Sequence, residues 1–172
     1  MRIVIDTNVV VSALVFSGGH LGWLRTAWQT GLVKPLVSKP VVGELIDVLK
    51  YPKFDIDADE REQMLAEYLP YCEVVTPSRK HSGLKCRDPE DVKFLQLAAE
   101  GCADFLVTGD SDLLSVAVQG VVVITPGDLR DRLTRSAHEQ RSERYRVAAA
   151  RRYHRRQSLE MSLGPPRGKE ML

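Results

Sequence analysis

Acidic residues stand at two points of this sequence where a strand-and-helix protein would bring them together. Asp6 follows the apolar run 1–5, and Asp110 follows a second apolar run over 104–107. Acids at the carboxyl ends of parallel strands face the crevice in which open α/β sheets bind ligands. If the strands are neighbours, about 5 Å apart, each close pair of charges costs about 3–4 kcal/mol at an effective dielectric near 20. A bound cation removes this repulsion, so the two acids indicate a metal site.

Two further acids lie near predicted helix ends or faces. Glu44 falls at the border of the apolar stripe of the helical segment 41–49, and the pattern alone favours a solvated helix-face acid. The segment 88–91 is a typical helix start, in which capping accounts for Asp88. Asp91 instead heads the buried stripe of the helix that follows, where an unpaired carboxylate is costly. Asp91 is therefore the better candidate for a ligand.

The residues beside these acids leave several interpretations open. Asp6 alone is explained by a helix cap, and turn chemistry would account for either Asp110 or Asp112, though less readily for both. Thr108 either supplies a hydroxyl to the site or bonds the backbone of the turn. Asn8 either supports Asp6 or stabilises the turn with its amide.

The elements that must position these residues follow from the alternation of short β-rich runs with helical patterns. This alternation predicts a doubly wound, three-layer α/β/α fold with a central parallel sheet. The predicted strands are 2–5, 35–37, 73–75, 104–107 and 121–124. The predicted helices are 8–15, 20–30, 40–50, 58–70, 89–100, 111–118 and 126–134. Residues 76–87 are predicted to be a loop.

Charge divides the chain unevenly. Residues 1–129 hold 12 Lys and Arg against 18 Asp and Glu, whereas residues 130–172 hold 12 against 5. We therefore predict a domain over 1–134 and a basic helical extension over 135–172, disordered from Gly164 onward. The extension is either a solvated charged helix or a surface for an anionic partner. The arginines proposed to contact nucleic-acid phosphates are Arg151, Arg152, Arg155 and Arg156.

Composition excludes several classes of protein. The three cysteines show no CxxC spacing and the four histidines are scattered, which argues against a zinc site or a disulfide framework and favours a reducing cytosol. Cys102 is expected to pack in the interior. No window of 18 apolar residues occurs, so neither a membrane span nor a secretory signal is expected, and the predicted location is cytoplasmic.

Four segments together resemble the PIN-domain nucleases, in the branch of toxin components of toxin–antitoxin systems related to VapC-like toxins. They are Asp6-Thr7-Asn8, the helix of Glu44, residues 87–95 and residues 108–114, and the resemblance spans about residues 1–130. It implies a small doubly wound α/β/α fold. It also implies Mg²⁺ or Mn²⁺ at the acids, hydrolysis of RNA phosphodiester bonds, an antitoxin that covers the site, and frequent dimerisation. The family's four acids fall on Asp6, Glu44, Asp91 and Asp110, and a frequent fifth falls on Asp112.

The predicted function is thus a divalent-metal-dependent endoribonuclease, the toxin of a toxin–antitoxin pair. Oxygen ligands suit Mg²⁺ or Mn²⁺, and we expect Asp6 and Asp110 to anchor the principal ion. Glu44 and Asp91 would complete the cluster or orient the attacking water. One alternative is a non-catalytic RNA- or protein-binding module that acts through the basic C-terminal region. A phosphatase with an aspartate nucleophile is disfavoured, because it needs a second Asp where residue 8 is Asn.

Overall fold

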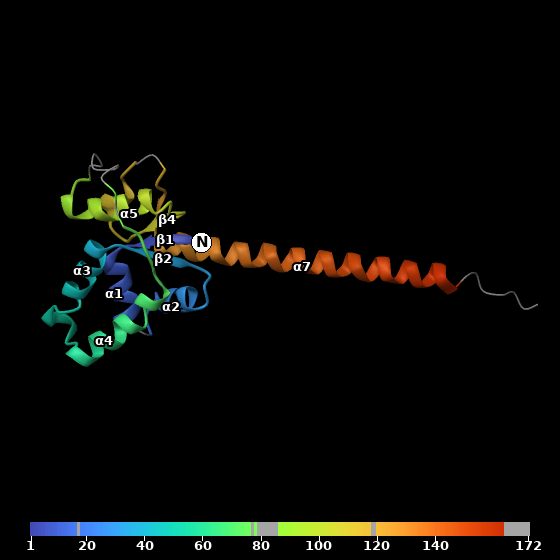
Figure 1. The fold of residues 1–172 in the computed structure, drawn as a ribbon, viewed down its shortest axis with the longest axis horizontal. Helices are drawn as coiled ribbons and strands as arrows, with labels where there is room; N and C mark the ends of the chain where they lie inside the picture. Colours follow the sequence, from blue (N-terminus) through green and yellow to red (C-terminus); the bar gives the residue numbers. More distant parts are fainter. Residues whose placement is uncertain (17, 77, 79–85, 118–119, 164–172) are drawn as a thin grey trace, which may run out of the picture. The chain divides into compact units, whose positions relative to one another are not determined.

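The computed structural model describes residues 1–16, 18–76, 78, 86–117 and 120–163 of the 172-residue chain. Its centre is a five-stranded parallel sheet of order β3-β2-β1-β4-β5 (Figure 1). The strands are β1 Arg2–Ile5, β2 Lys34–Val37, β3 Glu73–Val74, β4 Phe105–Val107 and β5 Val123–Ile124. The predicted parallel sheet is confirmed, although β3 and β5 are shorter than predicted.

The described residues form the helices α1 Thr7–Val15, α2 Gly22–Gln29, α3 Lys39–Val48, α4 Ala58–Ala66, α5 Val92–Glu100, α6 Ser111–Leu114 and α7 Pro126–Leu163. They also form the short 3₁₀ helices η1 Pro52–Phe54, η2 Leu69–Tyr71 and η4 Pro89–Asp91. Helices lie on both sides of the sheet, and Figure 1 shows α5 on one side of the strands and α1 and α2 on the other. The predicted three-layer α/β/α class is therefore confirmed.

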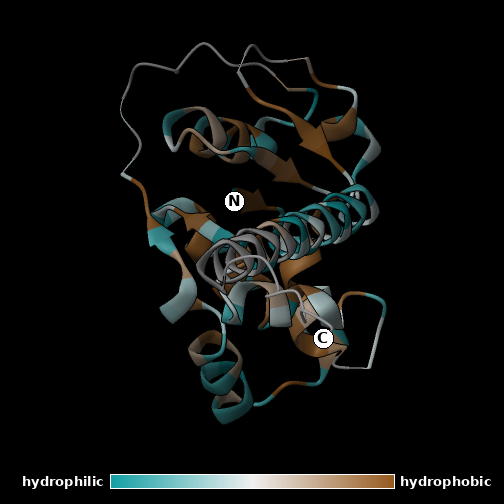
Figure 2. Cartoon of the chain, turned by 90° about the vertical axis from the view of Figure 1, so that its right-hand side faces the viewer, coloured by the Kyte–Doolittle hydropathy of each residue, from teal (hydrophilic) through white to brown (hydrophobic). Residues whose placement is uncertain are grey.

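The core explains why β1 is central. Its residues Ile3, Val4 and Ile5 are almost completely buried, as expected for a parallel strand that is covered on both faces. Phe94 and Leu95 of α5 pack in the same cluster as Val4. Figure 2 shows hydrophobic residues gathered on the strands, whereas much of α7 is hydrophilic.

The register of the sheet places three polar residues side by side at its carboxyl edge. Val4 of β1 is opposite Leu36 of β2 and Leu106 of β4. Two residues farther along, the same register puts Asp6 between Ser38 and Thr108. The ladder continues past the strands, because the Asp6 N–H donates to the Val107 carbonyl at 2.9 Å. The end of β1 is thus fixed by the sheet itself.

The chain divides into two compact units, Met1–Arg130 and Asp131–Leu172. Our predicted boundary, after residue 134, stays a prediction. The predicted helix 126–134 and the helical pattern from Ala137 onward are one continuous helix, α7. The tail from residue 164, and most of the predicted loop 76–87, lie outside the described residues. Among the described helices, none has both the length and the apolar character required to cross a membrane.

Candidate active site

Asp6 is the buried centre of the candidate site, with only 5% of its surface exposed. It begins α1, and its Oδ1 accepts a hydrogen bond from the Asn8 backbone N–H at 3.1 Å. Its Oδ2 accepts a second bond from the Thr108 hydroxyl at 2.7 Å. Burial raises the pKa of Asp6, the bonds from Thr108 and Asn8 oppose this rise, and the charges of Glu44 and Asp110 add to it. Asp6 therefore acts as a helix cap and carries an unfavourable charge at the same time.

Thr108 connects the two strand ends that carry the acids. Its hydroxyl donates to Asp6 and also accepts a bond from the Asp110 backbone N–H at 2.9 Å. The side chain is completely buried. Both interpretations of Thr108 are therefore realised at once, because the same oxygen contacts a site carboxylate and the backbone of the turn. For Asn8, the contact with Asp6 comes from the backbone amide, and the side chain is exposed.

Asp110 starts α6 and lies next to this hydroxyl. Its Oδ1 accepts a bond from the Asp112 N–H at 2.6 Å, which caps the short helix. The carboxylate of Asp112 forms an ion pair with Arg87 at 3.1 Å. Asp112 is therefore engaged by a cation of the chain, and its role as a metal ligand stays a prediction.

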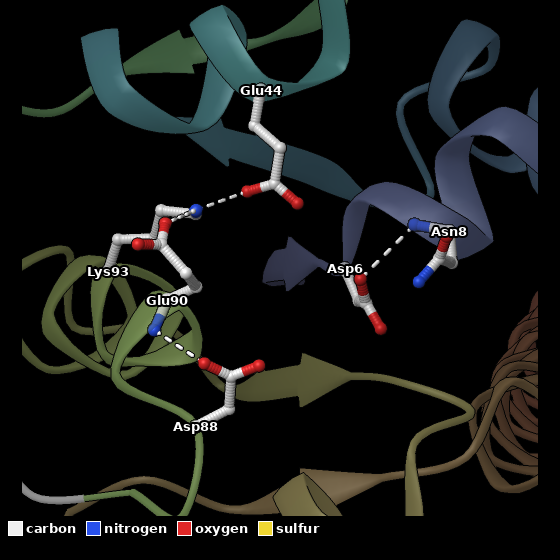
Figure 3. A network of polar contacts seen from close by, with 6 residues as sticks. All are labelled: Asp6, Asn8, Glu44, Asp88, Glu90 and Lys93. Atoms are coloured by element: carbon white, nitrogen blue, oxygen red, sulfur yellow. Dashed lines mark hydrogen bonds and ion pairs between the residues drawn. The ribbon is translucent and has the colours of Figure 1, made fainter. Parts of the chain in front are cut away.

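Helix α3 carries Glu44 and the start of α5 carries Asp91, and both acids lie near Asp6 and Asp110. Burial is the largest cause that raises the pKa of Asp91, and together with the charges of Asp88, Asp6, Asp110 and Glu44 it brings this pKa to about 6. Four predicted acids thus interact electrostatically, although 38 or more residues separate Asp6 from Glu44 and Glu44 from Asp91 along the chain. Figure 3 shows Glu44 and Asp6 directed toward a common space, with Asp88 on its opposite side.

Within the ranges that the structure describes, no three Asp, Glu, His or Cys side chains converge closely enough to hold a metal ion. The contacts give a physical reason. Thr108 and Asn8 hold Asp6, Lys93 holds Glu44, and the Asp112 N–H holds Asp110. Each carboxylate is thus held by a donor of the chain itself, but only Lys93 is charged, so most of the negative charge remains for an ion to neutralise.

The donor set nevertheless fits a hard divalent cation. It consists of carboxylate oxygens, and each such oxygen keeps a lone pair after accepting one hydrogen bond. The pKa values of Asp6 and Asp91 are raised first by burial and then by neighbouring carboxylates, so a bound cation would favour the charged form of both groups.

Two surface pockets give access to the acids. One, of about 400 Å³, is lined by Asp6, Asn8, Ser12 and Asp110 among others. The other, of about 600 Å³, is lined by residues that include Glu44, Tyr51, Glu90 and Lys93. Asp6 and Asp110 therefore share one pocket, whereas Glu44 lines a different one.

Sequence reasoning missed the residues that balance the acids. Lys93 pairs with Glu44 at 2.5 Å and Arg87 pairs with Asp112. Both cations flank the 88–91 segment, and their position in the sequence next to predicted acids could have indicated that they pair with acids of the site. Ser38 was also missed, and its buried hydroxyl has no hydrogen-bond partner among the described residues.

The predicted phosphate-binding arginines lie in the second unit. Arg151 and Arg152 are exposed on α7, whereas the side chains of Arg155 and Arg156 are outside the described part of the structure. These two exposed arginines are therefore available to an anionic ligand.

Comparison with known proteins agrees with this geometry. The structure resembles a chain in the crystal structure of VapBC2 from Rickettsia felis bound to a DNA fragment from the VapBC2 promoter. The TM-score is 0.51 and the sequence identity is 17%. The match covers 73% of this chain and 98% of that chain. An uncharacterized protein of Methanocaldococcus jannaschii is 27% identical over 117 residues, which are 67% of this chain and 75% of that protein.

The most direct comparison is with protein-family models. The model described as the PIN domain matches residues 2–112. This range includes the four acids, their capping turns and the central strand, and the resemblance stated from the sequence is confirmed. The chain belongs to the PIN domain family.

Proposed function

We propose that this protein is a divalent-metal-dependent endoribonuclease and the toxin of a toxin–antitoxin pair. The observation that carries the proposal is the buried carboxylate of Asp6, which the Thr108 hydroxyl connects to the turn of Asp110 beside a pocket that both acids line. The negative charges of Glu44 and Asp110 add to the raised pKa of this buried group. A fold maintains such repulsion at a cost, and a bound cation is the simplest reason to keep it. The fold likeness to VapBC2 supports the toxin part of the proposal.

In this mechanism Asp6, Asp91 and Asp110 would hold the ion. When bound, Mg²⁺ or Mn²⁺ lowers the pKa of a coordinated water and neutralises charge on the phosphate. Thr108 fixes the separation of the two strand ends, because its hydroxyl contacts both of them. Asp91, at the N-terminus of α5, would help to orient the attacking water.

The substrate must approach an acidic surface. Residues 1–129 carry an excess of six negative charges, which repels RNA in the absence of metal. The basic helix α7 would supply attraction through exposed arginines such as Arg151 and Arg152. We therefore expect substrate affinity to fall steeply with salt concentration.

The test is cleavage of a fluorescent single-stranded RNA with Mg²⁺ or Mn²⁺. Asp6→Asn and Asp110→Asn should each lower the rate at least 100-fold, because each removes a ligand charge. Asparagine remains a good helix cap, so both variants should fold. Asp59→Asn, an exposed acid on α4, is the matched control. Equal cleavage by wild type and Asp6→Asn would refute the metal mechanism.

A non-catalytic RNA-binding module is the second candidate, and the exposed arginines of α7 favour it. In that case wild type would not cleave RNA, and the double substitution Arg151→Glu and Arg152→Glu would abolish RNA binding. Under the nuclease proposal, the same substitutions would weaken binding of the substrate while the metal still binds the acids.

A further inference from the structure

Lys93 forms an ion pair with Glu44, one of the four site acids. Its Nζ lies 2.5 Å from Glu44 Oε2, which joins α5 to α3 (Figure 3). The side chains of Lys93 and Glu44 are 19% and 29% exposed, so water screens the pair only partly. Glu90 Oε2 is 3.4 Å from the same Nζ, but its side chain is 85% exposed. The Glu44 contact is therefore the main one.

A comparison with a second ion pair, between a lysine and an acid at the C-terminal end of α3, shows what is unusual about Lys93. Lys50 contacts Asp47 at 2.9 Å, three residues away on the same turn of chain, and both side chains are more than half exposed. Such a surface pair contributes little to stability. Lys93 instead holds an acid whose charge reaches Asp6 and Asp91. Its ammonium group therefore balances the charge of one of the four site acids.

The position of Lys93 is one that a cation could otherwise take. Glu44, Glu90 and Lys93 line the 600 Å³ pocket, so two carboxylates face the same ammonium group beside open space. With Lys93 in place, the four site acids carry three net negative charges. One divalent ion then leaves one negative charge, whereas two divalent ions would leave a net positive site.

We propose that Lys93 is a built-in counter-ion that takes the place of a second metal ion beside Glu44, and so limits this site to one divalent cation at Asp6, Asp91 and Asp110. The limit to one ion rests on the proposed function. The pairing of Lys93 with Glu44 in the metal-free protein does not depend on it.

The first experiment counts bound Mn²⁺ per chain by calorimetric titration and by electron paramagnetic resonance of the free ion. Wild type should bind one ion, and Lys93→Met should bind two. Lys50→Met is the matched control, since it removes a lysine from an ion pair on α3, and it should bind one. Two ions in wild type, or one ion in Lys93→Met, would overturn the proposal.

The second experiment measures thermal unfolding of the metal-free protein. Lys93→Met should lower the Tm by about 3–6 °C, because Glu44 is left without its partner. Adding Glu44→Gln should restore most of this loss, and Lys50→Met should change the Tm by about 1 °C or less. An unchanged Tm for Lys93→Met would refute the claim that Lys93 acts as a counter-ion of Glu44.

The two experiments separate the two proposals. Suppose that wild type binds no Mn²⁺ while the Tm changes occur as expected. The metal-dependent function would then fail together with the one-ion limit, and the Lys93–Glu44 counter-ion pair would stand. If wild type binds one ion but Lys93→Met leaves the Tm unchanged, the metal site would be supported and the proposed role of Lys93 would be refuted.

Discussion

The hydroxyl of Thr108 gives the sharpest test of how the site is built into the fold. Thr108→Val preserves the shape of the side chain and replaces the hydroxyl with a methyl group. It removes the bond to Asp6 Oδ2 and leaves the Asp110 N–H without its acceptor. Thr108→Ser keeps the hydroxyl and loses only the methyl group, so it is the matched control.

The expected loss follows from the two bonds. A hydrogen bond to a charged group contributes about 1.5–3 kcal/mol, and a neutral one contributes about 1 kcal/mol. Thr108→Val should therefore lower the free energy of unfolding by about 2–4 kcal/mol in metal-free buffer. Thr108→Ser should lower it by about 1 kcal/mol, from the loss of one buried methyl group.

The pH dependence of this loss gives an independent check. The Thr108 bond lowers the pKa of Asp6, which burial raises, so Thr108→Val should raise that pKa further. A carboxyl group whose pKa is raised by folding binds its proton more tightly in the native state, and stability therefore increases as the pH falls. The gap between valine and wild type should be largest near pH 7.5 and smaller near pH 5.

Urea unfolding followed by the fluorescence of the buried Trp28 is the suitable assay, with a chelator present. Valine and serine variants that unfold within 0.5 kcal/mol of each other, roughly the error of such measurements, would show that the hydroxyl does not couple the strand ends. A valine deficit that is identical at pH 5 and pH 7.5 would show that Asp6 is not the charged partner.

Three further predictions concern other parts of the domain. The pKa of Asp91 is raised to about 6, so the free energy of unfolding of the metal-free protein should fall as the pH rises from 4 to 7. Asp91→Asn should reduce this fall by about 1 kcal/mol, after allowance for solvent screening. Gly101→Ala should cost about 1–3 kcal/mol in urea unfolding, because its Cβ would lie 2.6 Å from Leu36 Cδ1 and 2.8 Å from the Leu97 carbonyl oxygen. Millimolar Mn²⁺ should raise the Tm of wild type by ligand binding and leave that of Asp6→Asn nearly unchanged.

The sheet and the convergence of the acids could be predicted from the sequence because both depend on short-range patterns. An apolar run followed by an acid predicts a strand and the edge at which it ends, and the register then aligns Asp6 with Thr108. The helix start before Asp91 could be read in the same way. The helix-cap interpretation of Asp6 and Asp110 proved correct, because each residue caps a helix with one oxygen. Their role as metal ligands stays a prediction.

Contacts between distant side chains could not be predicted in this way. Nothing in the sequence pairs Lys93 with Glu44 across 49 positions, and periodicity does not show which of several cations will face an acid. Cys102 was expected to be buried and is exposed. It follows Gly101, the C-cap residue of α5, and its backbone lies in the left-handed region at φ 47°. Such a turn residue is usually Gly or Asn, so the apolar surroundings misled the prediction.

Because Asp6 and Asp110 each begin a helix, descendants of this chain that no longer catalysed anything would still be constrained at these two positions. Relaxed selection should replace them with Asn or Ser, which keep the helix start, and rarely with Ala. Asp91 makes no side-chain bond to a helix end and should drift to many residue types, whereas Glu44 stays constrained by its ion pair with Lys93. Conservative loss of Asp6 and Asp110 together with free loss of Asp91 would identify an inactive copy without any assay.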